Sequence, residues 1–205
     1  MNREDSKAEG TGERIARIAI GLFREKGYDN VTIDEICRAA GVVKGTFYYH
    51  FKAKEEVVLN FYKRLAQRFD DKTARILVSS DNSWEKVWAI SASYFEQTSL
   101  AGPEVEGQII INGIKNRTNP FTMPEFHSRL RAIGIALIKK GQSLGHFRNM
   151  APPEALQNNM IHISIGLVFD WSVAGGSFDI KQAMKEATIA LLDVREDLLG
   201  EGEAS

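Results

Sequence analysis

The stretch from Thr32 to Lys54, TIDEICRAAGVVKGTFYYHFKAK, constrains the fold of this chain more than any other. Thr32 and Glu35 have the spacing of a capping box, in which each side chain accepts a backbone N–H at the start of a helix. The short apolar helix that follows ends at Gly41, where the absence of a Cβ permits a left-handed turn. A second short helix comes directly after this turn. The stretch therefore predicts a helix-turn-helix.

The second helix of this motif carries polar and aromatic groups on its outward face. Phe47 and Phe51 are expected to point inward, which turns two tyrosines, a threonine and a lysine outward. From Ile36 to Lys54 every charged residue is basic. A small basic helix fits the major groove of DNA, where such side chains contact base edges and phosphates. The alternative is a surface helical hairpin whose tyrosines pack on a neighbouring helix.

The run from Gly41 to Phe51, followed by Lys54 and Glu55, closely resembles the signature of the tetracycline-repressor (TetR) family of transcriptional regulators. In sequence the resemblance covers the first quarter of the chain, and in length and helical layout it covers the whole. It implies an all-α homodimer that binds operator DNA through an N-terminal domain. It also implies a small-molecule effector bound by the larger C-terminal domain.

The expected DNA contacts divide into groove contacts and phosphate contacts. The residues assigned to base edges or the groove are Lys44, Thr46, Tyr48 and Tyr49. The residues assigned to phosphates are Thr32, His50 and Lys54. Gly45 is expected to let the start of the helix approach the DNA backbone closely. Asp34 departs from better-known members of the family and should repel phosphate, so the first motif helix is given no contact beyond its cap.

Composition narrows the class of protein further. A formal net charge of −1 over 205 residues argues against a generally basic protein, so DNA affinity must come from a local patch. The single cysteine excludes an internal disulfide, and no Cys/His cluster suggests a metal site. The sequence has no secretory signal and no apolar run of about twenty residues, so we expect a soluble cytoplasmic protein without a membrane segment. No nucleophile–base pair or glycine-rich phosphate loop is present, so we expect neither an enzyme nor a cofactor.

The sequence predicts two helical domains. Residues 1–53 form the three-helix DNA-binding domain, in which a polar arm over 1–12 precedes a supporting helix with an apolar face. Residues 54–205 form a larger helical domain for ligand binding and dimerisation. A long helix that begins at Lys54 is expected to connect the two.

Small and hydroxyl residues interrupt the apolar helices of the larger domain, as at Ser91 and Gly134. Such residues leave room for a small molecule where helices are spread apart, and they permit close packing where helices touch. The sequence does not separate these alternatives, but the resemblance implies a pocket. The residues expected to line it are Leu65, Trp88, Ser91, Phe95, Ile110, Phe126, Leu130 and Asp170. Asp170 would suit a cationic ligand; the alternative is a place at the wet edge of its helix.

The last two predicted helices favour an interface between two copies of the chain. Residues 160–174 are apolar on nearly every face, and a chain of this size has little of its own surface to cover such a helix. The final helix, capped by Asp179, repeats apolar residues at a four-three alternation as far as Leu198. The residues expected at the interface are Met160, Leu167, Trp171, Met184, Ala187, Leu191 and Val194. The alternative is that both helices pack only within their own domain.

Together these patterns predict a dimeric transcriptional regulator. We expect a repressor that binds a palindromic operator and is released by a small molecule. An activator of the same fold is the near alternative, and the place of the operator relative to the promoter would separate the two. A helical small-molecule-binding protein or an enzyme is a further alternative, which saturable turnover of a ligand would favour and sequence-specific DNA binding would exclude.

Overall fold

The computed structural model describes residues 10–61, 75, 78, 82–117 and 124–199, with the backbone alone over 124–129. Across these residues the regular elements are helices, apart from one isolated antiparallel bridge between Phe147 and Val194. The expected all-α fold is confirmed. Within the same ranges, none of the helices combines the length and the apolar character needed to cross a membrane.

The described helices follow one another along the chain with short connections. They are α1 (Thr11–Lys26), α2 (Ile33–Ala40), α3 (Lys44–His50), α5 (Ser83–Ala101), α6 (Pro103–Asn116), α7 (Pro124–Ser143), α8 (Pro153–Val173) and α9 (Ile180–Leu192). A helical segment over residues 54–61 follows α3, and a 3-10 turn (Glu196–Leu198) follows α9.

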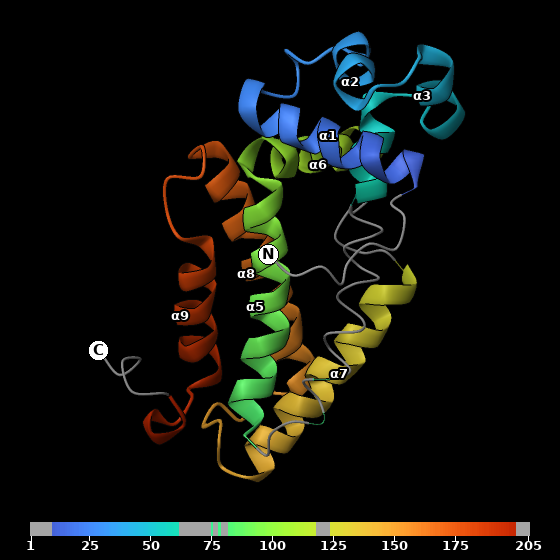
Figure 1. The fold of residues 1–205 in the computed structure, drawn as a ribbon. Coiled ribbons are helices and arrows are strands. Elements are labelled where there is room, and N and C mark those ends of the chain that lie inside the picture. The colour runs from blue at the N-terminus through green and yellow to red at the C-terminus, as the bar shows by residue number, and fades with distance from the viewer. Residues whose placement is uncertain (1–9, 62–74, 76–77, 79–81, 118–123, 200–205) are drawn as a thin grey trace, which may run out of the picture.

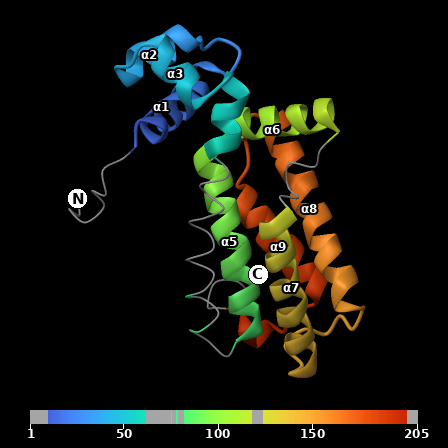
Figure 2. The same cartoon turned by 90° about the vertical axis from the view of Figure 1, so that its right-hand side faces the viewer.

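The helices form a small head on one end of a longer body (Figures 1 and 2). The head consists of α1, α2 and α3, and the body consists of α5, α7, α8 and α9. Helix α6 lies across the end of the body and contacts α1 of the head as well as α5 and α8. This arrangement makes α6 a direct physical link between head and body.

An apolar core fixes the three helices of the head relative to one another. Ile15, Ala19 and Phe23 line one face of α1 and are fully buried, as the apolar spacing predicted. Ile36 of α2 and Phe47 of α3 pack into the same core. Burying a side chain of this size stabilises a fold by about 1.5–3 kcal/mol, so the head is expected to move as one unit.

The core of the head continues past the predicted domain boundary between residues 53 and 54. Val57 and Val58, which follow that boundary, are buried in it. Val105 and Ile109 of α6 are buried in it too, although they lie about fifty residues further along the chain. The boundary therefore stays a prediction, and any motion of the head relative to the body must involve α6.

The turn of the helix-turn-helix has the predicted local chemistry. The hydroxyl of Thr32 accepts the backbone N–H of Glu35 at 3.2 Å and so caps α2. The pKa of the Glu35 carboxyl is lowered, first by a hydrogen bond from Lys26 and to a smaller extent by the backbone of Thr32. Gly41 ends α2 in the left-handed conformation, at φ 63° and ψ 38°, where a Cβ would be strained. The cap by Thr32 and the glycine turn are both confirmed.

The N-terminal arm is shorter than the sequence predicted. Helix α1 begins at Thr11, and the carboxylate of Glu13 accepts the backbone N–H of Gly10 at 2.8 Å in its first turn. The helix therefore includes the last two residues of the arm expected over 1–12. The rest of that arm lies outside the described residues.

Helix α9 is also shorter than predicted. The apolar spacing suggested that it continues to Leu198, but it ends at Leu192. Asp193 takes a left-handed conformation with φ 49°, which turns the chain out of the helix. Val194 then pairs with Phe147 in the antiparallel bridge, so the apolar repeat continues in a different structure.

Candidate DNA interface and ligand cavity

Helix α3 presents two aromatic rings to solvent. Phe47 is fully buried and anchors the helix, while Tyr48 and Tyr49 are 53% and 84% exposed. In both views α2 and α3 lie on the side of α1 that faces away from the body (Figures 1 and 2). The predicted division between inward phenylalanine and outward tyrosines is therefore present, and the tyrosines can reach a partner outside the chain.

The first turn of α3 is open. A Cβ built on Gly45 would have no heavy atom within 4 Å, so the protein's own packing does not require glycine there. Thr46 follows at a half-buried position, and Lys44 precedes at an exposed one. Close approach by the DNA backbone stays the predicted reason for Gly45.

Lys44 is paired with the acidic residue that the sequence marked as unusual. Its Nζ lies 2.7 Å from Oδ1 of Asp34, and both side chains are more than half exposed. The pKa of the Lys44 ammonium is raised, and the hydrogen bond with Asp34 is the largest cause. The carboxylate on α2 therefore forms an ion pair with the lysine that is predicted to contact the groove.

His50 and Thr32 flank the exposed face of α3. The His50 ring packs against the first turn of α1, since a Cβ on Gly12 would lie 3.1 Å from its Nδ1. The ring also meets Tyr49 edge-on, with 5.0 Å between centroids. Thr32 is exposed, with its hydroxyl used as the helix cap. Both residues are held in place by the fold, and their phosphate contacts stay predictions.

The structure places Lys54 differently from the prediction that it binds phosphate. Its Nζ donates to the backbone carbonyls of Tyr28 and Val31, each at 2.8 Å, and lies 4.4 Å from the centre of the Tyr28 ring. The ammonium is part-buried within the head and directed at its own backbone. This geometry assigns Lys54 to holding the loop between α1 and α2 against the segment that follows α3.

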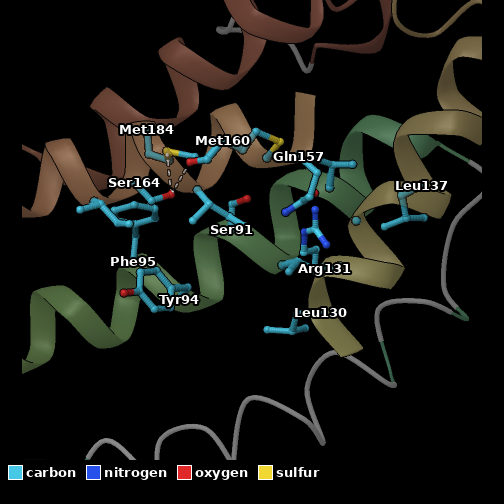
Figure 3. A pocket seen from close by; sticks show the side chains of 15 residues that line it. Ser91, Tyr94, Phe95, Leu130, Arg131, Leu137, Gln157, Met160, Ser164 and Met184 are labelled. Atoms are coloured by element: carbon cyan, nitrogen blue, oxygen red, sulfur yellow. Dashed lines mark hydrogen bonds between the residues drawn. The ribbon is translucent and has the colours of Figure 1, made fainter. Parts of the chain in front are cut away.

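The body contains a cavity of about 130 Å³ between α5, α7, α8 and α9 (Figure 3). Ser91, Phe95 and Leu130 line it, as predicted. The other residues that line it include Val87, Ile90, Tyr94, Arg131, Gly134, Gln157, Met160, Ser164 and Met184. A concave and mostly apolar space of this kind is the usual form of a small-molecule site.

Three polar side chains of the cavity wall were missed from the sequence. Arg131 donates from Nε and Nη2 to Oδ1 of Asn158, at 3.2 and 3.0 Å. Gln157 lies against Gly134, where a Cβ would come within 2.0 Å of its Oε1. Ser164 donates to the backbone carbonyl of its own helix (Figure 3). The small residue at Gly134 was the signal available in the sequence, because it leaves space on α7 for a neighbouring side chain.

Tyr94 adds a hydroxyl group to the wall on α5. Its pKa is raised well above the usual value for tyrosine, first by burial and then by the charge of Glu106. Glu106 lies on α6 and is fully buried. The phenol therefore stays protonated at neutral pH, and it can both donate and accept a hydrogen bond.

Trp88 belongs to the core and not to the cavity wall. Its ring stacks on that of Trp84, with 6.0 Å between centroids and 13° between planes. The ammonium of Lys185 lies 5.6 Å from the same ring on the α9 side. Trp88 and Phe95 were both expected to line a pocket, and of the two only Phe95 lines this cavity.

The remaining predictions for the cavity have mixed outcomes. Asp170 is exposed on the surface of α8, so its alternative reading as a wet-edge residue is the correct one. Ile110 packs against the body core without lining the cavity. Leu65 and the Phe126 side chain lie outside the described residues.

The chain resembles known proteins most strongly where the exposed helix lies. The sequence model described as "Bacterial regulatory proteins, tetR family" matches residues 15–60, which include all of α2 and α3. Residues 15–60 thus form a TetR-family DNA-binding domain. The similarity of the chain is to transcriptional regulators and not to enzymes, and the helix-turn-helix in its head is the matched DNA-binding element.

Two curated relatives show how far this similarity extends. The Transposon Tn10 TetC protein of Escherichia coli is 35% identical over 97 residues, which are 46% of this chain and 48% of that protein. The transcriptional repressor KstR2 of Rhodococcus jostii is 24% identical over 193 residues, or 93% of each chain. The chain thus aligns with about half of TetC, and with nearly all of KstR2 at lower identity.

Three solved structures share the fold. KstR2 of Mycobacterium tuberculosis has a TM-score of 0.62 at 19% identity, covering 93% of this chain and 98% of that one. AibR with isovaleryl coenzyme A and operator DNA has a TM-score of 0.62 at 16% identity, covering 91% and 100%. FadR of Thermus thermophilus with lauroyl-CoA has a TM-score of 0.58 at 22% identity, covering 90% and 96%. The arrangement of head and body is therefore that of the family.

Four of the residues predicted at a dimer interface are buried within the chain itself. These are Met160, Trp171, Met184 and Val194, and each belongs to the core of the body. A side chain that is already buried in its own chain has little surface left for a partner, so the structure places these four in the core of the body and their contact with a second copy stays untested. Leu167, Ala187 and Leu191 are half-buried.

The outer face of α8 carries exposed apolar side chains instead. Phe169 is 54% exposed and Val173 is 72% exposed. Gly166, one turn before them, is exposed too, as is Ala190 on α9. Gly166, Phe169 and Val173 lie on the opposite side of α8 from its buried side chains, because a helix rotates by about 100° per residue. An interface on α8 and α9 therefore stays a prediction, and the apolar side chains that are free to form it on α8 are Phe169 and Val173.

Among the residues that the structure describes, no three His, Cys, Asp or Glu side chains lie close enough together to hold a metal ion. Cys37 is buried on α2 within the core of the head. Burial raises the pKa of its thiol, which therefore stays protonated and behaves as a small apolar side chain.

Proposed function

We propose that this TetR-family protein is a repressor that binds a palindromic operator as a homodimer and is released by a small molecule. The single observation that carries the proposal is the exposure of Tyr48 and Tyr49 on α3 while Phe47 locks the same helix into the core. A rigid helix with outward aromatic and hydroxyl groups suits the major groove. The name of the relative KstR2 in Rhodococcus jostii, a transcriptional repressor, favours the direction of control.

The proposed contacts follow from the geometry of α3. Tyr48, Tyr49 and Thr46 would reach base edges, and Lys44 would neutralise a phosphate or contact a base after leaving Asp34. Gly45 would let the backbone of α3 approach the DNA. Thr32 and His50 would meet phosphates on either side of the groove, while Lys54 would stabilise the head.

A homodimer is supported by the exposed apolar face of α8 and α9. Phe169 and Val173 would be removed from water when a second copy packs against this face, and Gly166 and Ala190 would let the helices approach closely. Two heads held by one interface would meet two half-sites, so the operator is expected to be palindromic.

The cavity supports binding of a small molecule in the body. Two neighbours of the same fold are named as complexes with acyl-coenzyme A compounds, isovaleryl coenzyme A and lauroyl-CoA. The wall of this cavity is mostly apolar with a few polar groups, which suits the apolar part of such a molecule.

Helix α6 offers a route from the cavity to the head. It contacts α5 and α8, which line the cavity, and it buries Val105 and Ile109 in the core of the head. A ligand that shifts α5 or α8 would displace α6 and change the separation of the two heads. A coupling of about 1–3 kcal/mol would lower operator affinity by about 5- to 150-fold, and DNA would weaken the ligand by the same factor.

Selection of binding sites from random duplex DNA tests the proposal. The full-length protein should select a palindrome with two half-sites about one helical turn apart, near 34–36 Å. Tyr48→Ala should then lose about 1–3 kcal/mol of specific binding at one base position. A protein that selects no sequence, or selects a single half-site with one copy bound, would contradict the proposal.

An activator is the alternative within the same family. It uses the same head, so DNA binding alone does not distinguish it. Transcription from the promoter next to the selected operator, measured with and without the protein, does so: a repressor lowers the transcript and an activator raises it.

A further inference from the structure

The cavity in the body has one apolar end and one polar end. Phe95 and Met184 lie at the apolar end, near the contact of α5 with α9, where the hydroxyl of Ser164 donates to a backbone carbonyl of its own helix. Arg131 and Gln157 lie beside each other at the α7 end (Figure 3). A molecule that fills this space is in contact with both ends. It must therefore be amphipathic, with a compact apolar body and a polar head that faces α7.

Arg131 gives the polar end a positive charge. Its side chain is exposed, which places it where the cavity opens to solvent. Two of its five N–H donors bind Oδ1 of Asn158, so a neutral amide holds the guanidinium without cancelling its charge. Within the described ranges, no carboxylate forms an ion pair with Arg131. The remaining donors suit an anion at the opening.

Gln157 adds an uncharged polar group just inside this opening. Its amide fits only because α7 has a glycine opposite, since a Cβ on Gly134 would come within 2.0 Å of its Oε1. The amide therefore lies at the boundary between the apolar wall and Arg131. A carbonyl or carboxylate oxygen of a ligand would accept a hydrogen bond from it at this depth.

The volume of the cavity limits the apolar part of the ligand. It measures about 130 Å³, slightly less than the roughly 150 Å³ of an engineered protein cavity that binds benzene. An apolar body of about six carbon atoms therefore fits. A chain twice as long would have to extend through the opening.

We propose that the effector is an anionic acyl compound, with an acyl group of about six carbon atoms in the cavity, its carbonyl oxygen at Gln157 and its negative charge at Arg131. The proposal rests on the proposed function and specifies the ligand class of that site. A free carboxylate and a coenzyme A thioester share this chemistry. They differ in which group carries the negative charge, and a binding measurement with each compound distinguishes the two.

Isothermal titration calorimetry of the full-length protein tests the proposal with three probes: hexanoate, hexanoyl-coenzyme A and the neutral hexan-1-ol. At least one anionic probe should bind more tightly than the alcohol. Arg131→Gln should weaken that probe by about 10- to 100-fold, the range for a lost hydrogen bond to a charged group, and leave hexan-1-ol unchanged. Lys139→Gln is the matched control, because it removes one positive charge from α7 outside the cavity wall.

A second variant tests the polar pair independently. Gly134→Ala would push the Gln157 amide aside and should weaken the same probe without changing the fold, since the atoms it meets are the end of a flexible side chain. If hexanoate binds and Arg131→Gln weakens its binding, the ligand is the free acid. If only hexanoyl-coenzyme A binds, the ligand is the thioester.

Three results would overturn the proposal: equal binding of hexan-1-ol, equal weakening by Lys139→Gln, or no binding of any probe. In each case selection of an operator by the same protein would show that the regulatory function stands and that only the ligand class is wrong. If the protein binds the acyl probe but selects no operator, the ligand class stands and the proposed regulatory function is wrong.

Discussion

At the scale of single residues, the ion pair between Lys44 and Asp34 sets a competition. Lys44 lies 2.7 Å from a carboxylate that must be left behind before the ammonium can bind DNA. The same carboxylate then faces a phosphate backbone that repels it. Asp34 therefore opposes binding both before and after Lys44 changes partner.

Replacing Asp34 by Asn should strengthen operator binding. We expect roughly two- to fivefold tighter binding at low salt, because exposed pairs of this kind are weak and screened by salt. Fluorescence anisotropy with labelled operator at several salt concentrations would measure the change. Asp29→Asn removes an exposed charge from the same head and serves as the control. Weaker binding by Asp34→Asn would mean that the carboxylate orients Lys44 for DNA.

Lys54 leads to a prediction about stability. Lys54→Met should leave the carbonyls of Tyr28 and Val31 without their donor and destabilise the protein by about 1–3 kcal/mol. Denaturant unfolding would measure this loss, with the exposed Lys52→Met as control. Once the loss in folded protein is corrected for, the salt dependence of operator binding should be unchanged. If the slope of log affinity against log salt concentration instead became shallower by about one unit, Lys54 would be shown to contact a phosphate.

At the scale of elements, the end of α7 depends on a close contact with the segment that follows it. A Cβ on Gly141 would lie 2.1 Å from Cε2 of the buried Phe147 ring. Phe147 is also the partner of Val194 in the bridge that follows α9. Gly141 therefore lets α7 pack directly on the segment between α7 and α8, which the bridge joins to the residues after α9.

Gly141→Ala should destabilise the protein by about 1–3 kcal/mol, because a fully buried ring cannot move aside without disturbing the core. Gly21→Ala is the matched control in α1, where a Cβ meets nothing within 4 Å. That control should stabilise the protein by about 0.5–1 kcal/mol through its effect on helix propensity. Thermal or denaturant unfolding of both variants would check the difference in sign. Similar stability of the two would show that Phe147 has room to move.

At the scale of the whole molecule, the proposed function depends on two copies acting together. The proposed interface on α8 and α9 leaves Phe169 and Val173 exposed in a single chain. Two heads joined by such an interface bind two half-sites as one event, and the second contact is made at a high effective concentration.

Phe169→Glu should produce a folded monomer. Because Phe169 is 54% exposed in the single chain, a charge there leaves the core intact but opposes burial against a partner. Light scattering should show half the mass, and operator affinity should fall by about 10²- to 10⁴-fold. Leu100→Glu, a similar change at a residue that is 53% exposed on α5, should stay dimeric. A Phe169→Glu protein that remains a dimer would move the interface to another face.

The sequence by itself determined the local structure of the head. Thr32 and Gly41 act through hydrogen bonds and backbone conformation within a few residues, so their effects do not depend on the rest of the chain. The inward direction of Phe47 follows from helical spacing in the same way. For these reasons the helix-turn-helix and its exposed tyrosines were predicted residue by residue, and the family followed from them.

The tertiary structure alone decided which face of each body helix meets which neighbour. Trp88 and Ser91 are three residues apart on α5, yet only Ser91 lines the cavity, because the Trp88 ring stacks on Trp84 and lies near Lys185 of α9 instead. Met160 and Phe169 share α8, and the first is buried in the chain while the second is exposed. Apolar periodicity shows that a helix has a buried face, but it does not identify the partner that buries it.

The same limit applies to Lys54. A lysine beside a DNA-reading helix suggests a phosphate contact, and its actual acceptors are carbonyls 23 and 26 residues away in the chain. Contacts at such separations depend on how the chain closes in three dimensions. The sequence therefore determined the class of protein and its reading helix, while the packed structure decided the cavity, the exposed face of α8 and the role of Lys54.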